Sequence, residues 1–166
     1  MRILVILFII PVFFAFQSKK NDATSIVEIN NYDSWDSSFV IHLYYGGGMR
    51  YMSKNIYFRH DSCIVINMDQ GIDLYSGFVM NKDHKTTVLS LLKKHRFFNL
   101  KQSENRGFAH DKATTSICVE GKEKYCVSSG SSTEVKENDR TDFNDLFHAL
   151  ETFAYENYSS DKKKKK

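Results

Sequence analysis

The chain has 166 residues, a formal net charge of +3, 42% hydrophobic and 14% aromatic residues, one Pro and three Cys. One folded domain is the natural prediction, because domains usually contain about 100–200 residues. The 22 Phe and Tyr residues, with many Ile, Leu and Val, can fill a core. The composition therefore excludes collagen, a coiled coil and a wholly disordered chain, but it indicates no particular chemistry.

Residues 1–18 have the pattern of a secretory signal peptide. A positive end at Met1 and Arg2 precedes an apolar run of fourteen residues, 3–16, and a short exit sequence that includes Ala15 and Ser18. We expect cleavage near residues 15–18. An uncleaved membrane anchor is the alternative, although a spanning helix needs about 20 apolar residues. The segment has no cysteine for lipid attachment, so we expect a secreted or periplasmic protein with no membrane span after cleavage.

The charge of the remaining chain is unevenly distributed. From residue 19 onward there are 22 Lys and Arg, but five of them are Lys162–Lys166, so residues 19–161 have 17 cations against 20 acids. Nucleic-acid-binding domains usually have a basic face, so we expect no nucleic-acid partner. The polar residues 19–37 predict a linker, residues 38–158 the single domain, and residues 159–166 a disordered Lys-rich tail.

The first part of the domain predicts a meander of four antiparallel strands. Apolar and aromatic side chains alternate over residues 39–45, 50–59, 63–68 and 72–80, and turn residues separate these runs. In the third run, Ile64, Ile66 and Met68 share one face. The glycines at 46–48 lie between two strands, which favours a turn with positive φ over a phosphate-binding loop.

Two helices follow from a change in hydrophobic period. The first is predicted over 84–96 with Asp83 as its N-cap, and its apolar stripe leads into an apolar plug of three residues, Phe97, Phe98 and Leu100. The second is predicted over 142–157 with Thr141 or Asp139 as its cap. Its apolar residues recur at helical spacing: Phe143, Leu146, Phe147, Leu150, Phe153 and Ala154.

Two of the three cysteines fall in a predicted hairpin formed by residues 114–120 and 124–128. If Val119 faces Tyr125, the register also places Cys118 directly opposite Cys126. Opposed Cβ atoms lie about 4.5–5.5 Å apart, close enough for local adjustment to form a disulfide in an oxidising compartment. We therefore hypothesise a Cys118–Cys126 disulfide. Cys63 is left as a free thiol or an intermolecular partner, and its apolar neighbours favour burial.

The remaining polar residues predict no catalytic, cofactor-binding or metal-ligating site. The histidines at 42, 60, 84, 95, 110 and 148 lack the spacing of a zinc motif, and the acids around Gly71 lack that of an EF-hand. A glycosidase needs two carboxylates across a cleft, and sequence alone cannot pair any of the 20 acids.

The order of several short motifs resembles a group of small exported bacterial domains, often lipoproteins, that have no assigned function. These motifs are Tyr44-Tyr45-Gly46-Gly47, Phe97-Phe98-x-Leu100 and Asp111-x-x-Thr114-Thr115, and the resemblance covers about residues 39–155. The lipid-attachment cysteine of the lipoprotein members is missing from this chain. The resemblance implies no catalytic residues.

These observations predict an α+β fold, an antiparallel sheet made of the meander and the C-terminal hairpin, with two helices packed on one face. For function, they favour a non-enzymatic exported binding module for a protein or glycan partner. Residues 50–59 mix aromatic and cationic side chains, which suits a recognition surface. The alternatives are a secreted hydrolase whose acids meet only in the fold, and an inhibitor of a secreted enzyme that uses the 46–48 loop.

Overall fold

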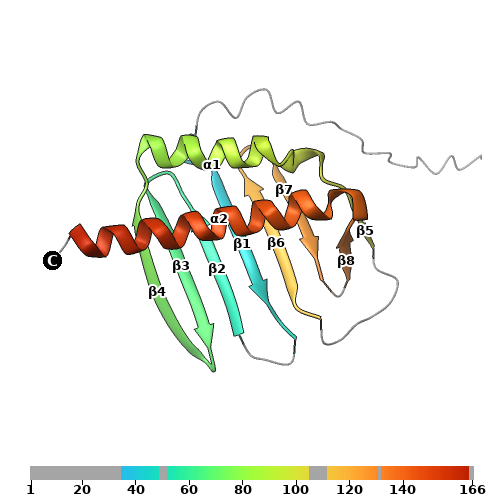
Figure 1. The fold of residues 1–166 in the computed structure, drawn as a ribbon, viewed down its shortest axis with the longest axis horizontal. Helices are drawn as coiled ribbons and strands as arrows, with labels where there is room; N and C mark the ends of the chain where they lie inside the picture. The colour runs from blue at the N-terminus through green and yellow to red at the C-terminus, as the bar shows by residue number, and fades with distance from the viewer. Residues whose placement is uncertain (1–34, 49–51, 105–111, 131, 165–166) are drawn as a thin grey trace, which may run out of the picture.

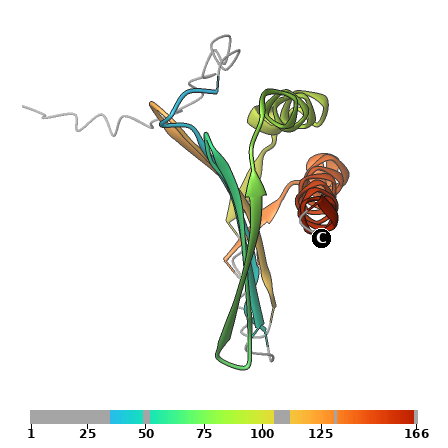
Figure 2. The same ribbon diagram turned by 90° about the vertical axis from the view of Figure 1, so that its left-hand side faces the viewer.

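A computed structural model describes residues 35–48, 52–104, 112–130 and 132–164. Its main element is a six-stranded antiparallel sheet in the order β4-β3-β2-β1-β6-β7, with both long helices on one face (Figure 1, Figure 2). The predicted α+β class is therefore confirmed. The strands of this sheet are β1 (Val40–Gly46), β2 (Met52–Phe58), β3 (Ser62–Asp69), β4 (Ile72–Val79), β6 (Thr114–Glu120) and β7 (Lys124–Ser129).

The four strands β1 to β4 form the predicted meander with small shifts at their ends. Arg50 and Tyr51, with which the second strand was expected to begin, lie outside the described residues. The β6–β7 hairpin continues the sheet by pairing β6 with β1, so that Ile41 lies opposite Val119 and Leu43 opposite Ile117. This register places aliphatic side chains next to each other on the face that carries the helices, which we call the inner face.

The core lies between the inner face and the helices α1 (Lys82–Lys94) and α2 (Glu137–Lys164). A short 3₁₀ helix, η1 (Phe97–Asn99), closes one end. Both predicted apolar stripes contribute to the core, and the apolar plug after the first helix also does so through Phe97 and Leu100. The fully buried side chains from the helices include Val88, Leu92, Phe143, Leu146 and Leu150.

The start of α1 corrects the predicted N-cap. The helix begins at Lys82 and is capped by Asn81, whose side-chain oxygen accepts the backbone N–H of His84 at 2.8 Å. Asp83 instead lies in the first turn, where its negative charge complements the helix dipole. An Asn in extended conformation two residues after the strand can start the helix earlier than the apolar period indicates.

The bounds of α2 also differ from the prediction. The helix begins at Glu137 and extends to Lys164, so Asp139 and Thr141 lie inside it rather than at its cap. Residues 159–164 continue the helix, which corrects the expected end at 157 and the expected tail over 159–166. No Gly or Pro occurs between 137 and 164, so the usual stop signals are missing.

The domain begins earlier than predicted. Trp35 is buried, its ring lies edge-on 4.9 Å from Phe39, and its Nε1–H donates to the Phe39 carbonyl at 3.0 Å. The last residues of the expected linker 19–37 therefore belong to the domain, while residues 19–34 lie outside the described part of the chain.

A second, two-stranded sheet was not predicted. It pairs β5 (Gln102–Glu104) with β8 (Thr133–Val135) and lies beside β7. The Gln102 side chain accepts a hydrogen bond from the backbone N–H of Ser128 at 2.9 Å, so one backbone group on the free edge of β7 is already paired within the molecule. Strands of three residues are too short to show a hydrophobic period, and only the fold brings them together.

Candidate interaction surface

Among the residues that the structure describes, no helix covers the sheet face opposite α1 and α2, which we call the outer face, because both helices pack on the inner face (Figure 2). Strand alternation directs every second side chain to it. Its twelve most central side chains are those of His42, Tyr44, Asn55, Tyr57, Ile64, Ile66, Met68, Tyr75, Ser116, Cys118, Cys126 and Ser128.

The centre of the outer face is an ordered stack of rings. The His42 and Tyr57 rings are parallel within 2°, with centroids 4.3 Å apart. His42 Nε2 lies 3.0 Å from Asn55 Oδ1, which makes that nitrogen an N–H donor to the amide oxygen. The Arg59 guanidinium lies 5.5 Å from the Tyr57 ring centre, within cation–π range. The stack is therefore held in place before any ligand arrives.

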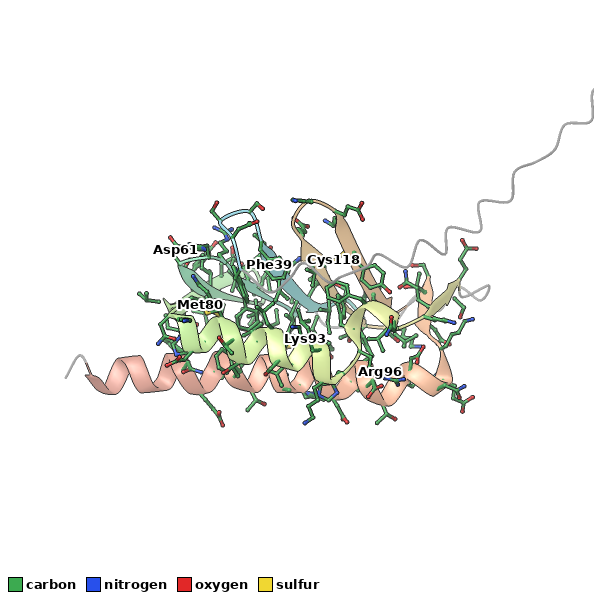
Figure 3. The ribbon with its side chains drawn as sticks, turned by 90° about the horizontal axis from the view of Figure 1, so that it is seen from above. Phe39, Asp61, Met80, Lys93, Arg96 and Cys118 are labelled. Carbon is green, nitrogen blue, oxygen red and sulfur yellow. A yellow bond between two sulfur atoms is a disulfide. The ribbon has the colours of Figure 1, made fainter. Side chains whose placement is uncertain are left out.

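The predicted hairpin register is confirmed, since Val119 pairs with Tyr125 and Cys118 with Cys126. The two cysteines form a disulfide in the structure, with their Cα atoms 4.1 Å apart. Cys118 is also the cross-strand neighbour of His42. The disulfide therefore links β6 to β7 next to the ring stack. Figure 3 labels Cys118 on the sheet.

The half of the outer face toward β4 is more apolar. Ile64, Ile66 and Met68 share this face of β3, as predicted, and Tyr75 of β4 is the cross-strand neighbour of Ile66. The core side of the same strand consists of smaller residues, among them the buried Cys63. The first half of the strand is thus apolar on both faces, and among the described residues only the inner face is covered by helices.

The glycine loop after β1 has the predicted geometry. Gly47 and Gly48 have φ of 88° and 79°, in the left-handed region that favours glycine. The loop connects two strands rather than a strand and a helix, so it does not supply the helix N-terminus of a phosphate site.

Cys63 is not positioned as a nucleophile. It is 1% exposed, and burial raises the pKa of its thiol to about 12, so the reactive thiolate is scarce at neutral pH. Among the residues that the structure describes, no group of three or more His, Cys, Asp or Glu could hold a metal ion.

Several carboxylates serve as structural ion-pair partners. Hydrogen bonds from Arg96 lower the pKa of Asp142, and those from Lys112 lower the pKa of Glu134. A glycosidase acid needs the opposite shift. Lys54 pairs with Glu151 and so ties β2 to α2; burial acts to lower the pKa of Lys54, but its hydrogen bond and charge interaction with Glu151 raise it overall.

The aromatic and cationic side chains of β2 and of Arg59, which follows it, are divided between the two faces of the sheet. Tyr57 belongs to the outer face, with Arg59 beside its ring, whereas Phe58 is in the core and Lys54 reaches α2 on the inner side. Sequence reasoning did not find the outer face as one surface. The alternation of Tyr44 with Leu43 and of Tyr57 with Phe58 was the available signal, but both sets are apolar enough to be buried.

Neither a protein-family model nor a curated protein matches this chain. Within the described residues, no helix combines the length and the apolar character needed to cross a membrane.

Proposed function

We propose that the protein is an exported, non-enzymatic binding module that binds a partner protein with the outer face of its sheet. The observation that carries this proposal is the ordered His42–Tyr57 stack at the centre of a sheet face that no helix of the described residues covers. Fixed aromatic side chains contribute contact area at a low entropic cost, because they lose little freedom on binding.

The composition of the outer face favours a protein over a glycan. Tyr, Met and Arg are enriched in protein interfaces, and Tyr57, Tyr75, Met68 and Arg59 supply these types here. The charged strand residues of this face, Asp73, Glu120 and Lys124, lie near strand ends, and the positions between them are uncharged, which is also typical of the centre of an interface.

The outer face is large enough for most of a protein–protein interface. Six strands about 4.8 Å apart, with lengths near 25 Å, make a surface of roughly 600 Å². A specific protein complex buries about 800 Å² on each partner, so the outer face and its rim can supply an interface of standard size.

Export is a separate part of the proposal, supported by the leader pattern of residues 1–18 and by the Cys118–Cys126 pair. It is tested by fractionating the source cells and determining the N-terminus of the mature protein. We expect an N-terminus shortly after residues 15–18 in the exported fraction. A cytosolic protein beginning at Met1 would contradict it.

The binding proposal is tested by inserting a charge into the outer face. Wild type, Ile66→Lys and a control, Thr152→Lys on the exposed side of α2, are immobilised and exposed to the native envelope fraction. Proteins retained by wild type are identified, purified and titrated against all three variants. We expect one purified protein to bind wild type and Thr152→Lys equally and Ile66→Lys at least about tenfold more weakly.

Two outcomes would contradict the proposal. One is that every retained protein binds Ile66→Lys as well as it binds wild type. The other is that purified glycans, and no protein, show the same dependence on residue 66. Circular dichroism of the three variants checks that the lysine has not unfolded the sheet.

A further inference from the structure

The two edges of the sheet differ in how they are protected. Edge strands leave backbone groups unpaired and are usually shielded by charge, proline or a covering element. β7 carries Lys124, and Gln102 of the small sheet satisfies its Ser128 N–H. β4 at the other edge has eight residues and only one charged residue, Asp73.

The exposed apolar side chains of the molecule gather at this open edge. Ile72, Leu74, Tyr75 and Val79 of β4 are 65%, 59%, 68% and 72% exposed. Two further large exposed apolar residues among the described residues, Tyr45 and Met52, lie at the same end of the sheet as Ile72 and Leu74, on the inner face below α2.

The free hydrogen-bonding groups of β4 can be assigned from its pairing with β3. The Met80 N–H donates to the Asp61 carbonyl, so alternation of the antiparallel ladder directs the backbone groups of Leu74 and Ser76 toward β3. The N–H and C=O groups of Asp73, Tyr75 and Gly77 and the N–H of Val79 then point away from the sheet, available to another strand, whereas the Val79 carbonyl lies 3.2 Å from His84 Nδ1.

We propose that β4 pairs antiparallel with β4 of a second copy of this chain, about a two-fold axis near Ser76, so that the two sheets join into one of twelve strands. In this register Tyr75 lies opposite Gly77 of the second copy, an arrangement in which an aromatic ring covers a glycine. Leu74 lies opposite Phe78, so apolar side chains also meet on the inner face.

The path of α2 fits this two-fold arrangement. The helix crosses β4 near Phe78, where Phe153 lies 6.2 Å from the Phe78 ring, and then runs past the sheet edge (Figure 1). The twelve residues from Phe153 to Lys164 are separated by eleven helical steps and span about 16 Å, or about three strand spacings. The two-fold axis places the C-terminal end of α2 from the second copy over Leu74 of this copy, running toward Met52. This is the region of the inner face that this copy's own α2 does not cover.

Charge also favours the antiparallel arrangement. The β3–β4 turn is acidic, with Asp69 and Asp73, whereas the other end of β4 is net basic. The charged residues of that end are Arg59, Lys82 and Lys85 against Asp61 and Asp83. Antiparallel pairing brings each acidic end beside the basic end of the other copy.

The exposed side chains of β4 can supply part of a dimer interface. Their exposed parts amount to roughly 500 Å² on each copy, which sets an upper limit of about 1,000 Å² on the area that their pairing removes from water, near the lower end for a specific interface. The overlap of α2 with the second sheet adds to this area.

The test is the molar mass of the purified protein in solution, measured by sedimentation over the micromolar range. We expect a monomer–dimer equilibrium in the wild type. Val79→Asp puts a negative charge at an exposed edge position directly opposite Asp73 of the second copy, and Tyr75→Pro removes an outward N–H without breaking the ladder to β3. Each should weaken the dimer at least about tenfold, whereas Asn99→Lys, an exposed position beside β7, should leave it unchanged.

A wild type that stays monomeric over this range would overturn the proposal, and so would a dimer that survives Val79→Asp. Val79 is exposed, so that variant is informative even if Tyr75→Pro fails to fold. The axis is tested with Ser76→Cys, which should form a reducible cross-linked dimer on mild oxidation, because opposed residues of a non-hydrogen-bonded pair have Cα atoms about 4.5 Å apart. A dimer sensitive to the edge variants but not cross-linked by Ser76→Cys would overturn the placement of the axis at Ser76.

Discussion

Gly77 shows how a single residue sets the distance between two strands. A Cβ atom added there would lie 2.3 Å from the carbonyl oxygen of Cys63, a backbone atom that cannot rotate away. The close approach lets the sheet twist at the edge next to the buried Cys63. The glycine is therefore required by packing rather than by a turn.

Gly77→Ala is expected to lower the free energy of unfolding by about 1–3 kcal/mol, because β3 and β4 must separate to admit the methyl group. Urea denaturation followed by circular dichroism measures this. Ser76→Ala, the neighbouring position, should change stability by less than about 0.5 kcal/mol. Equal stability of the two variants would refute the close contact.

The three cysteines should be chemically distinct. Cys118 and Cys126 are paired, and Cys63 is buried with its pKa raised to about 12. The folded protein should therefore react slowly or not at all with a thiol reagent, because little thiolate is accessible.

Mass spectrometry after alkylation is the measurement. One thiol should be labelled after unfolding without reductant, and all three after unfolding with reductant. Labelling of three thiols without reductant would show that the hairpin cysteines are free in solution.

At the scale of elements, local interactions set where the helices begin and how they are joined. Asn81 caps α1 through the His84 N–H, and the end of α1 is joined to α2 by Arg96, whose guanidinium nitrogen lies 2.5 Å from an Asp142 carboxylate oxygen. The Asn81 contact satisfies a backbone N–H at the start of α1, whereas the Arg96–Asp142 pair connects the segment after α1 to the second turn of α2.

Asn81→Ala should cost about 1 kcal/mol of stability, because the N–H of His84 loses its acceptor. Asn81→Asp keeps an acceptor oxygen in the same place and should lie within a few tenths of a kcal/mol of wild type. Thermal unfolding of the three proteins measures these stability differences. An alanine variant as stable as the aspartate variant would show that the Asn81 cap contributes nothing to stability.

The Arg96–Asp142 pair should make stability depend on acid pH. Hydrogen bonds from Arg96 lower the pKa of Asp142 below its ordinary value of 3.8 in the folded state. A carboxyl with a depressed folded pKa stabilises the protein fully above its unfolded pKa and loses that contribution as the pH falls through its folded pKa.

Asp142→Asn should therefore have a lower melting temperature than wild type at neutral pH, and the difference should close progressively below about pH 4. Asp145→Asn, an exposed acid on the next turn of α2, serves as the control and should show a smaller difference. A melting difference for Asp142→Asn that is constant from neutral pH to pH 2 would contradict the assignment.

At the scale of the whole molecule, α2 covers the inner face of the sheet from β8 to β4 (Figure 1). Its apolar stripe is fully buried at Phe143, Leu146 and Leu150, so the helix and the sheet share one core. Because neither side can bury its apolar surface alone, they should unfold together.

Leu150→Ala should lower stability by about 2–5 kcal/mol without changing the denaturant dependence, because a cavity forms in a core that still unfolds as one unit. Thr152→Ala, exposed on the same turn, should have little effect. A second unfolding transition in Leu150→Ala would show that α2 detaches separately.

The parts of the fold that were predictable have strong local signals. The alternation in β1 to β4, the 3.6-residue period of α2 and the paired register of β6 and β7 each extend over several residues. The N-cap of α1 and the burial of Trp35 were missed because each depends on a single residue, which shows no hydrophobic period. The strands β5 and β8 were missed because they are three residues long and pair with residues distant in sequence.

The sequence by itself determined the kinds of elements, their order and the opposed cysteines, because these follow from side-chain spacing along the chain. Only the tertiary structure decided that the hairpin joins the meander at β1, that β4 is left as an open edge, and that α2 runs beyond it. It also decided which face of β3 is covered, since Val65 and Ile66 are equally suited to a core. With two helices available for one face, the other face of an apolar strand stays outside, and the candidate interaction surface is the result.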